Sequence, residues 1–275
     1  MGTMREILET EATGSIAEVY REIGEFYAAP YVSSLFRHLA TYPRLLEWTW
    51  KILRPALAQG FLQHIAWSKV DVSMLEPLTP INKSDFSKLE IDEIDVPTIS
   101  NVYETFARVS PVNLVVSGCL QRLLVEGEIK RRNGKLRRYA LPSSLSKMPQ
   151  MLSWDELGSK QRRILRIFET ELAGDVFIPG IYRILARWPT YLEFVATELG
   201  PKLSNQVILD QCGKIADDIF NSAPEVLQVL RLDCVDPPIN QCQTIKVLSA
   251  INTYRQTSPQ MLVFGTLLLQ TFQRS

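Results

Sequence analysis

The chain has 275 residues, enough for one large domain or two smaller ones that each bury a core. Hydrophobic residues make up 46%, and 30 Lys and Arg balance 30 Asp and Glu, which excludes a disordered chain and a strongly basic nucleic-acid binder. The longest apolar run, PQMLVFGTLLLQTF (residues 259–272), is too short to span a bilayer, and the acidic N-terminus is unlike a secretory signal. We therefore expect a cytoplasmic protein without a membrane segment.

Few residues in the chain could hold a metal or carry redox chemistry. The four cysteines include no CxxC pair, and the chain has only two histidines, so a zinc cluster is not expected. The sequence contains neither a glycine-rich phosphate loop nor a GxSxG motif. We predict a protein without metal or cofactor, whose cysteines are mostly small core residues.

Apolar residues recur at helical spacing nearly throughout, which predicts an all-α protein. In the first half, Ser15 and Glu18 have capping-box spacing and predict a helix to about residue 28. Ser110 followed by Pro111 is typical of a helix start. Further helices are expected at residues 31–40, from Pro43 with a kink at Pro55, at 60–75 and at 99–109.

The second half follows the same plan. Ser153 and Glu156 form a second capping-box pattern, and a long helix is expected through RRILRIFETEL, residues 162–172. Ser258 and Pro259 then predict the start of the last apolar helix, as Ser110 and Pro111 do in the first half.

One stretch of the chain occurs twice. FRHLATYPRLLEW (residues 36–48) resembles YRILARWPTYLEF (residues 182–194), with Pro43 and Pro189 lying 146 positions apart. Such a long period is not that of a solenoid. It predicts two related helical repeats, residues 1–128 and 153–275, packed as a fused pseudo-dimer and joined by a basic linker at 129–152.

Residues shared by both halves are best interpreted as fold determinants, and residues unique to one half as candidates for function. By this rule the pairs Glu47 with Glu193 and Arg37 with Arg183 are expected to be structural.

The basic segment IKRRNGKLRRYAL (residues 129–141) allows two interpretations. Its Asn133-Gly134 pair could form a hairpin like the wing of a winged-helix DNA binder, or the segment could be a solvated linker. We favour the linker, because the net charge is zero and the second half has no matching wing, and we expect no nucleic-acid partner.

The stretches APYVSSLFRHLATYP (residues 29–43) and WPTYL (residues 188–192) resemble the group I 2-haloacid dehalogenase family, also called halocarboxylic acid dehydrogenases. The resemblance implies an all-α protein of two related halves, with a core similar to that of alkylhydroperoxidase-D-like proteins. In that family an aspartate activates a water that displaces halide directly from a small 2-substituted carboxylic acid, without a covalent enzyme ester.

The resemblance also implies site residues, counted from the shared Trp-Pro. The family's Ser-Asp pair falls on Gly180 and Ile181, so the catalytic base is missing, and Asp175 is a weak replacement that we expect near a helix N-terminus. The family's other site residues fall on Tyr31, Ser34, Ser110 and Tyr254, so these four with Gly180 and Ile181 are the predicted substrate-binding residues.

The predicted function is therefore that of a 2-haloacid dehalogenase-like protein whose hydrolytic chemistry is altered or lost. The expected partner is a small carboxylate, bound in a pocket near Tyr31, Ser110 and Ile181, and the protein could form a homodimer. The alternative is a non-catalytic helical protein that binds an apolar small molecule or another partner, in one version nucleic acid through the basic segment.

Overall fold

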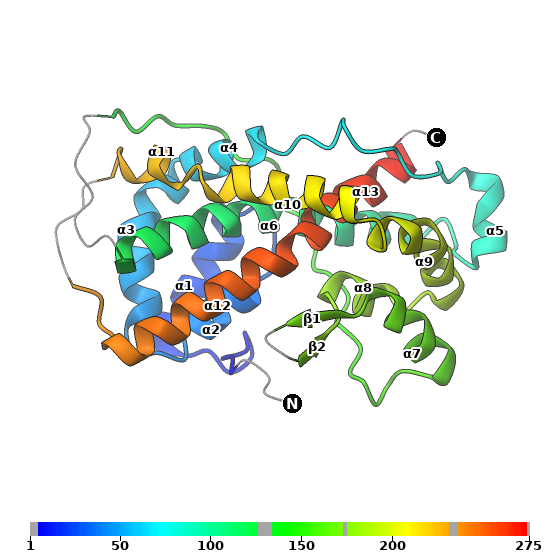
Figure 1. The fold of residues 1–275 in the computed structure, drawn as a ribbon, viewed down its shortest axis with the longest axis horizontal. Helices are drawn as coiled ribbons and strands as arrows, with labels where there is room; N and C mark the ends of the chain where they lie inside the picture. Colours follow the sequence, from blue (N-terminus) through cyan, green and yellow to red (C-terminus); the bar gives the residue numbers. More distant parts are fainter. Residues whose placement is uncertain (1–4, 126–133, 173–174, 231–235, 274–275) are drawn as a thin grey trace. The chain divides into compact units, whose positions relative to one another are not determined.

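The computed structural model describes residues 5–125, 134–172, 175–230 and 236–273. The protein is all-α as predicted, apart from one two-stranded ribbon (Figure 1). It divides into two compact units, each assembled from three segments of chain. Unit 1 comprises residues 1–70, 108–146 and 216–256, and unit 2 comprises 71–107, 147–215 and 257–275. No helix of the described residues is long and apolar enough to cross a membrane.

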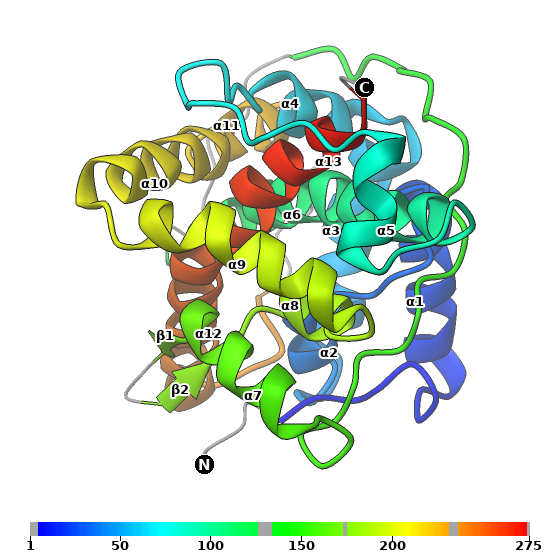
Figure 2. The same cartoon turned by 90° about the vertical axis from the view of Figure 1, so that its right-hand side faces the viewer.

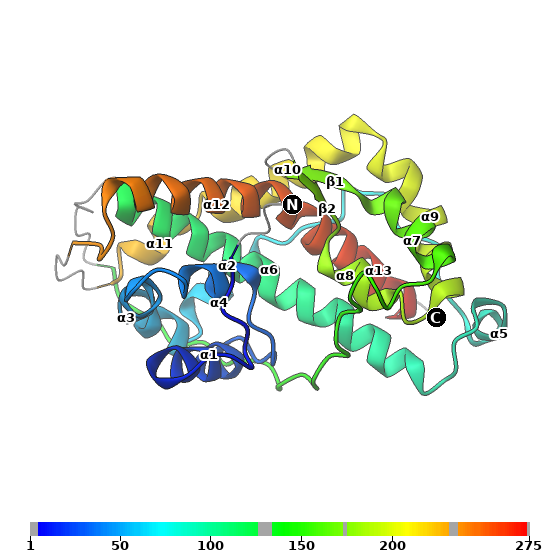
Figure 3. The same cartoon turned by 90° about the horizontal axis from the view of Figure 1, so that it is seen from below.

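Unit 1 is built on four consecutive helices: α1 (Gly14–Phe26), α2 (Ser34–Leu39), α3 (Leu45–Ala58) and α4 (Phe61–Ser68). α3 packs against α1, α2 and α4, and α4 also contacts α11 (Ala223–Leu227) (Figure 3). The C-terminal part of α6 (Asp95–Val125) and most of α12 (Gln241–Pro259) complete this unit.

Unit 2 centres on α7 (Ser159–Leu165), α8 (Gly180–Leu185) and α9 (Pro189–Leu203), with α7 and α8 both packed on α9 (Figure 2). The 3-10 turn η2 (Arg166–Phe168) extends α7. Strands β1 (Thr170–Leu172) and β2 (Asp175–Phe177) pair antiparallel, with Thr170 opposite Phe177. The remaining elements are the 3-10 turn η1 (Lys83–Asp85), α5 (Phe86–Leu89), most of α10 (Gln206–Phe220), the π-helical segment η3 (Gln260–Phe264) and α13 (Gly265–Gln273).

Amphipathic spacing explains why α1 forms and which face it buries. Val19, Ile23 and Phe26 recur every three or four residues and are all buried, with Tyr20 beside them. Full burial of one apolar side chain of this size stabilises the fold by about 1.5–3 kcal/mol. An isolated helix of 13 residues, the length of α1, is only marginally stable in water. α1 is therefore held by packing on α3.

Both predicted capping boxes differ from the structure. α1 begins at Gly14 after Thr13, and the Ser15 hydroxyl donates to Glu47 on α3 instead of capping its own helix. In the second half, the Ser153 amide does donate to Glu156 Oε2, but the residues form a turn and α7 begins only at Ser159. The Gln161 side chain accepts from the Gly158 amide at that start.

The two Ser-Pro pairs do not start helices either. Pro111 lies inside α6, and Pro259 is the last residue of α12, directly before the π-helical segment. A proline inside a helix removes one backbone hydrogen bond and costs about 3 kcal/mol. The upstream turn of α6 buries Val102, Phe106 and Val109 almost completely, which outweighs that cost.

The long helix predicted through residues 162–172 is also wrong at its end. It stops at Leu165, continues as η2 to Phe168, and Thr170–Leu172 forms β1. Glu169 is already extended, with φ −62° and ψ 133°, so the chain turns into the ribbon there.

The described part of the linker is residues 134–152, of which 134–146 belong to unit 1 and 147–152 to unit 2, and none of it is helix or strand. The Tyr139 amide donates to the Gln59 carbonyl at 2.7 Å, and the Tyr139 ring stacks on His64 with 3.8 Å between ring centroids. Asn133 of the predicted turn lies outside the described residues, and residues 134–146 contain no strand.

The residues shared by the two similar stretches, 36–48 and 182–194, make structural contacts. Glu47 accepts from Ser15 on α1 at 2.8 Å, and Glu193 pairs with Lys160 on α7 at 2.8 Å. The Arg37 guanidinium pairs with Glu6. In unit 2, Arg183 donates to the Leu152 carbonyl. Glu47 and Glu193 each connect two helices. Arg37 and Arg183 each connect a helix to an earlier, non-helical segment of the chain.

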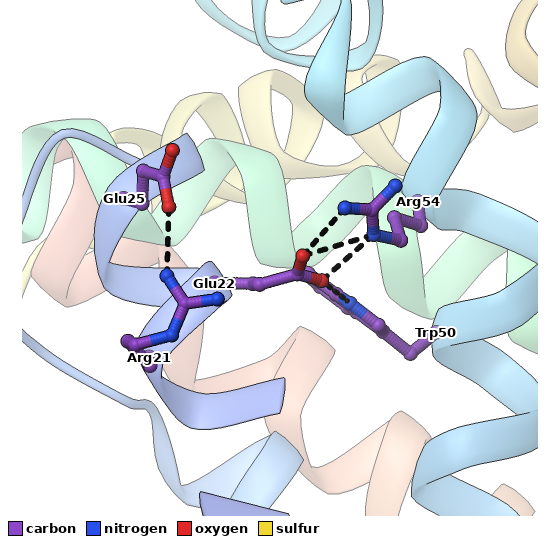
Figure 4. Close-up of polar contacts among 5 residues, drawn as sticks. All are labelled: Arg21, Glu22, Glu25, Trp50 and Arg54. Carbon is purple, nitrogen blue, oxygen red and sulfur yellow. Dashed lines mark hydrogen bonds and ion pairs between the residues drawn. The ribbon is translucent and has the colours of Figure 1, made fainter. Parts of the chain in front are cut away.

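A buried indole and a carboxylate lock α1 to α3 (Figure 4). Trp50 Nε1 donates to Glu22 Oε2 at 2.6 Å, and Arg54 donates to both Glu22 oxygens from Nε and Nη2. The Trp50 ring is 4% exposed and stacks on Phe26. Hydrogen bonds from Arg54 and then Trp50 lower the pKa of Glu22 to about 2, against an opposing effect of burial.

Glu22→Gln is expected to reduce the free energy of unfolding by about 1 kcal/mol at pH 7, because the charged acceptor of Arg54 is lost. Since the folded pKa of Glu22 lies below its ordinary value, the contribution is complete above about pH 4.5 and disappears as the pH falls towards 2. Urea unfolding of both proteins at several pH values should show the difference shrinking in that window.

Glu25→Gln is the matched control, because Glu25 pairs with Arg21 one turn apart on α1 and both side chains are more than 60% exposed (Figure 4). Its loss should cost only a few tenths of a kcal/mol. An equal effect of the two substitutions, or a Glu22 effect that persists at pH 2, would contradict this assignment.

Candidate functional site

The turn between α1 and α2 carries the first of the predicted site residues and has a strained backbone. Ala28 adopts a left-handed conformation with φ +50°, which is unfavourable for a residue with a Cβ. Its carbonyl oxygen accepts from the Leu145 amide at 2.9 Å and from Arg108 Nη1 at 3.0 Å. Arg108 Nη1 also donates to the Ser143 carbonyl at 2.6 Å. Arg108 and the extended segment thus hold this turn in place.

A chain of buried side-chain hydrogen bonds lies next to that turn. Tyr27 Oη donates to Asn113 Oδ1 at 3.0 Å, and Asn113 Nδ2 donates to Tyr254 Oη at 3.1 Å. Tyr27 and Asn113 are fully buried, and Tyr254 is 5% exposed. Burial raises the pKa of Tyr27 well above its usual value, so this phenol stays neutral and acts as a donor. The network joins α1, α6 and α12 within unit 1.

A second buried amide ties α4 to the end of α1. Gln63 is fully buried, and its Nε2 donates to the Phe26 and Leu57 carbonyls at 2.9 Å each. Its Oε1 has no hydrogen-bond partner among the residues that the structure describes. This free acceptor lies on a side chain bonded to Phe26, the residue before Tyr27.

The structure places four predicted site residues in unit 1. Tyr254 is part of the buried network, and Ser110 is buried on α6 one turn before Asn113, which puts the two on the same face of the helix. Tyr31 is half-buried and lies under the Arg37 guanidinium at 6.0 Å, and burial raises the pKa of its phenol. Ser34 is the first residue of α2.

Gly180 and Ile181 are the first two residues of α8 in unit 2 and have apolar surroundings. Ile181 is fully buried, and its Cδ1 lies 3.4 Å from where a Cβ on Gly265 would stand. A Cβ on Gly180 would lie 2.9 Å from Met151 Cε and 3.7 Å from Phe106 Cζ. Whether position 181 corresponds to the family's aspartate stays a prediction.

Asp175, the weak candidate for a replacement base, does not lie at a helix N-terminus. It is the first residue of strand β2 and pairs with Leu172 in the ribbon. The helix expectation fails because the chain turns back on itself here, and α8 begins only at Gly180.

Sequence reasoning missed Tyr27, Asn113 and Arg108. One available signal was the lone Asn113 within the apolar run VNLVV, because a buried amide needs partners. In the part of the chain that the structure describes, no group of three or more His, Cys, Asp or Glu side chains could hold a metal ion.

Asn113→Leu is expected to reduce the free energy of unfolding by about 2 kcal/mol, because it removes the acceptor of the fully buried Tyr27 hydroxyl and the donor to Tyr254. The triple variant with Tyr27→Phe and Tyr254→Phe should recover part of that loss, since it no longer leaves the buried Tyr27 hydroxyl without its acceptor. Urea unfolding measures both. A triple variant no more stable than Asn113→Leu would show that the network is not the reason for the loss.

No protein-family model matches the chain. A curated (R)-2-haloacid dehalogenase from Pseudomonas putida is 20% identical over 270 residues, which is 92% of this chain and 87% of that protein.

Two solved structures have a similar fold. A D-2-haloacid dehalogenase mutant in complex with D-2-CPA is 16% identical with a TM-score of 0.76, covering 98% of this chain and 95% of that one. A D-2-haloacid dehalogenase in complex with L-LA is 17% identical with a TM-score of 0.76, covering 98% and 96%. At these identities the structural likeness establishes the fold.

Proposed function

Since the chain resembles the group I 2-haloacid dehalogenases along nearly its whole length, we propose that it binds a small 2-substituted carboxylic acid and that hydrolysis of this ligand is altered or lost. The observation that carries the proposal is Ile181, a fully buried aliphatic side chain at the position where the resemblance puts the family's catalytic aspartate.

The chemistry at position 181 follows from the side chain. Direct displacement of halide by water needs a group that takes a proton from the water, and an isoleucine has no such group. Loss of a positioned general base typically costs a factor of about 10² to 10⁴ in rate. Here the base would also generate the nucleophile, so the loss should lie at the upper end.

We assign ligand binding to the polar residues of unit 1. Tyr31, Ser34, Ser110 and Tyr254 carry hydroxyls that can donate to a carboxylate. The neutral Tyr27–Asn113–Tyr254 network supports this choice, because it fixes the Tyr254 hydroxyl with a hydrogen bond from Asn113. Binding roles for Gly180 and Ile181, a cytoplasmic location and a homodimer stay predictions.

We further propose that the chain arose by internal duplication with an exchanged segment. α2 and α8 have the same length and start 146 positions apart, and α3 and α9 share a proline at the same spacing. Positions 71–107 shifted by 146 are 217–253, which fall within the segment 216–256 of unit 1, while 71–107 itself belongs to unit 2. This reciprocal arrangement supports two repeats that have swapped one segment, as in a fused pseudo-dimer.

The proposal predicts no halide release above background from racemic 2-chloropropionate by the unmodified protein, but a saturable rise in its thermal unfolding midpoint with that acid. Ile181→Asp is expected to gain halide release. Because apolar surroundings raise the pKa of a buried carboxylic acid, the activity should increase with pH above the ordinary range of aspartate.

Ile181→Asn is the matched control, with the same shape and polarity change but no base. Halide release by Ile181→Asp alone supports a surviving pocket that lacks its base. Rapid release by the unmodified protein would overturn the assignment, and Asp175→Asn would then test the other carboxylate. If no variant binds the acid while all remain folded, the non-catalytic binding alternative replaces this proposal.

A further inference from the structure

A pocket of about 360 Å³ opens between α7 with η2 and α9, within unit 2. Its volume lies within the range of small-molecule sites. The lining residues are Arg163, Ile164, Ile167, Glu193, Ala196 and Thr197. None of them belongs to the site described above.

The corresponding place in unit 1 lies between α1 and α3. α7 starts 145 positions after α1, and the residues of α9 follow those of α3 by 146, a spacing kept by the matching contacts of Glu47 and Glu193. With the offset of 146 between α9 and α3, Ala196 takes the position of Trp50. With the offset of 145 between α7 and α1, Ile167 takes the position of Glu22. Gly200 takes the position of Arg54.

In unit 1 this place is filled by a side chain of the protein. The Trp50 indole is buried between the helices, bonded to Glu22, which Arg54 holds in turn (Figure 4). In unit 2 the indole, the carboxylate and the guanidinium are replaced by a methyl group, an apolar side chain and a hydrogen atom.

Unit 2 compensates only in part for the missing ring. Phe168 takes the position of the smaller Ile23 and stacks on Tyr182, with 3.8 Å between ring centroids. The pocket nevertheless remains next to Ala196, and Ile167 on its wall is 47% exposed.

The charges at the pocket favour an anion. Arg163, at the position of Glu18, has an exposed side chain that makes no hydrogen bond or close ion pair with any residue that the structure describes, although its charge helps to lower the pKa of Glu193 after the larger effect of Lys160. The only carboxylate in the lining, Glu193, is already paired with Lys160 at 2.8 Å. Two cations, Arg163 and Lys160, thus face the single carboxylate of Glu193, so the charge beside the apolar walls is positive on balance.

We propose that this pocket binds a small aromatic carboxylate. The ring takes the place that Trp50 occupies in unit 1, between Ile164, Ile167 and Ala196, and the carboxylate pairs with Arg163. A guanidinium suits such a contact because it can donate two parallel hydrogen bonds to a carboxylate. Ile167 offers no acceptor to the ring, so a ligand without a ring N–H should also fit.

Indole-3-acetate, which carries the tryptophan ring and one carboxylate, is the probe for a calorimetric titration of the full chain. Saturable one-site binding is expected. Its neutral amide, indole-3-acetamide, should bind about tenfold more weakly, and Arg163→Gln should weaken only the acid, by about the same factor. The absence of saturable binding of indole-3-acetate would overturn the proposal.

Ala196→Trp tests the place of the ring. It should remove binding and leave the thermal unfolding midpoint unchanged or higher, because the new indole fills existing space. A midpoint several degrees lower would show that the space does not accept a ring and would contradict the proposal. Binding that survives both Ala196→Trp and Arg163→Gln unchanged would place the ligand elsewhere and overturn it as well.

Discussion

The packing of a short amphipathic helix against a longer helix that contains a proline is the constraint on which each unit depends. α1 packs on α3, and α7 packs on α9, and in both pairs the apolar face of the first helix is buried against the second. Because neither α1 nor α7 is long enough to be stable alone, its position is fixed by the side chains at this contact. A substitution at this contact changes the space between the two helices more readily than it changes the fold.

The two helix pairs have side chains of different size between their helices, and this difference gives the pairs different roles. Trp50 fills the interior of one pair and obtains a hydrogen-bond partner for its N–H, so the space between α1 and α3 is filled. Ala196 leaves the other pair open. Two pairs with the same backbone plan can thus act as a structural element in one unit and as a binding element in the other, without any change in helix order.

The all-α class and most helix positions could be predicted from the sequence, because they depend on local apolar spacing. The predicted helix at 31–40 and the observed α2 at Ser34–Leu39 agree in this way. The Ser-Pro pairs misled because a proline is tolerated inside a helix when the flanking turns are buried, which only the tertiary structure decides. The strand at Asp175 was missed because a three-residue ribbon leaves little periodicity.

The candidate site was less predictable, for a physical reason. Its network links Tyr27, Asn113 and Tyr254, which lie more than 80 positions apart and share no local pattern. The pocket of unit 2 is even harder to predict from the sequence, because it lies where the side chain of Ala196 is small. The small size of Ala196 is informative only in comparison with Trp50 at the corresponding position. The proposal for Ile181 could be made from the sequence alone, since the type of residue decides whether a base exists.

Ile181 and Ala196 together describe how such a chain can diverge. A buried aspartate carries a desolvation cost that a catalytic site must offset, and an isoleucine in the same apolar surroundings removes that cost. The free energy of unfolding gained from isoleucine at position 181 can offset the packing energy lost at Ala196, where a large aromatic side chain would otherwise fill the space. Under the two proposals, the same fold has lost a reaction at one place and opened a binding pocket at another while each helix pair keeps its apolar contact.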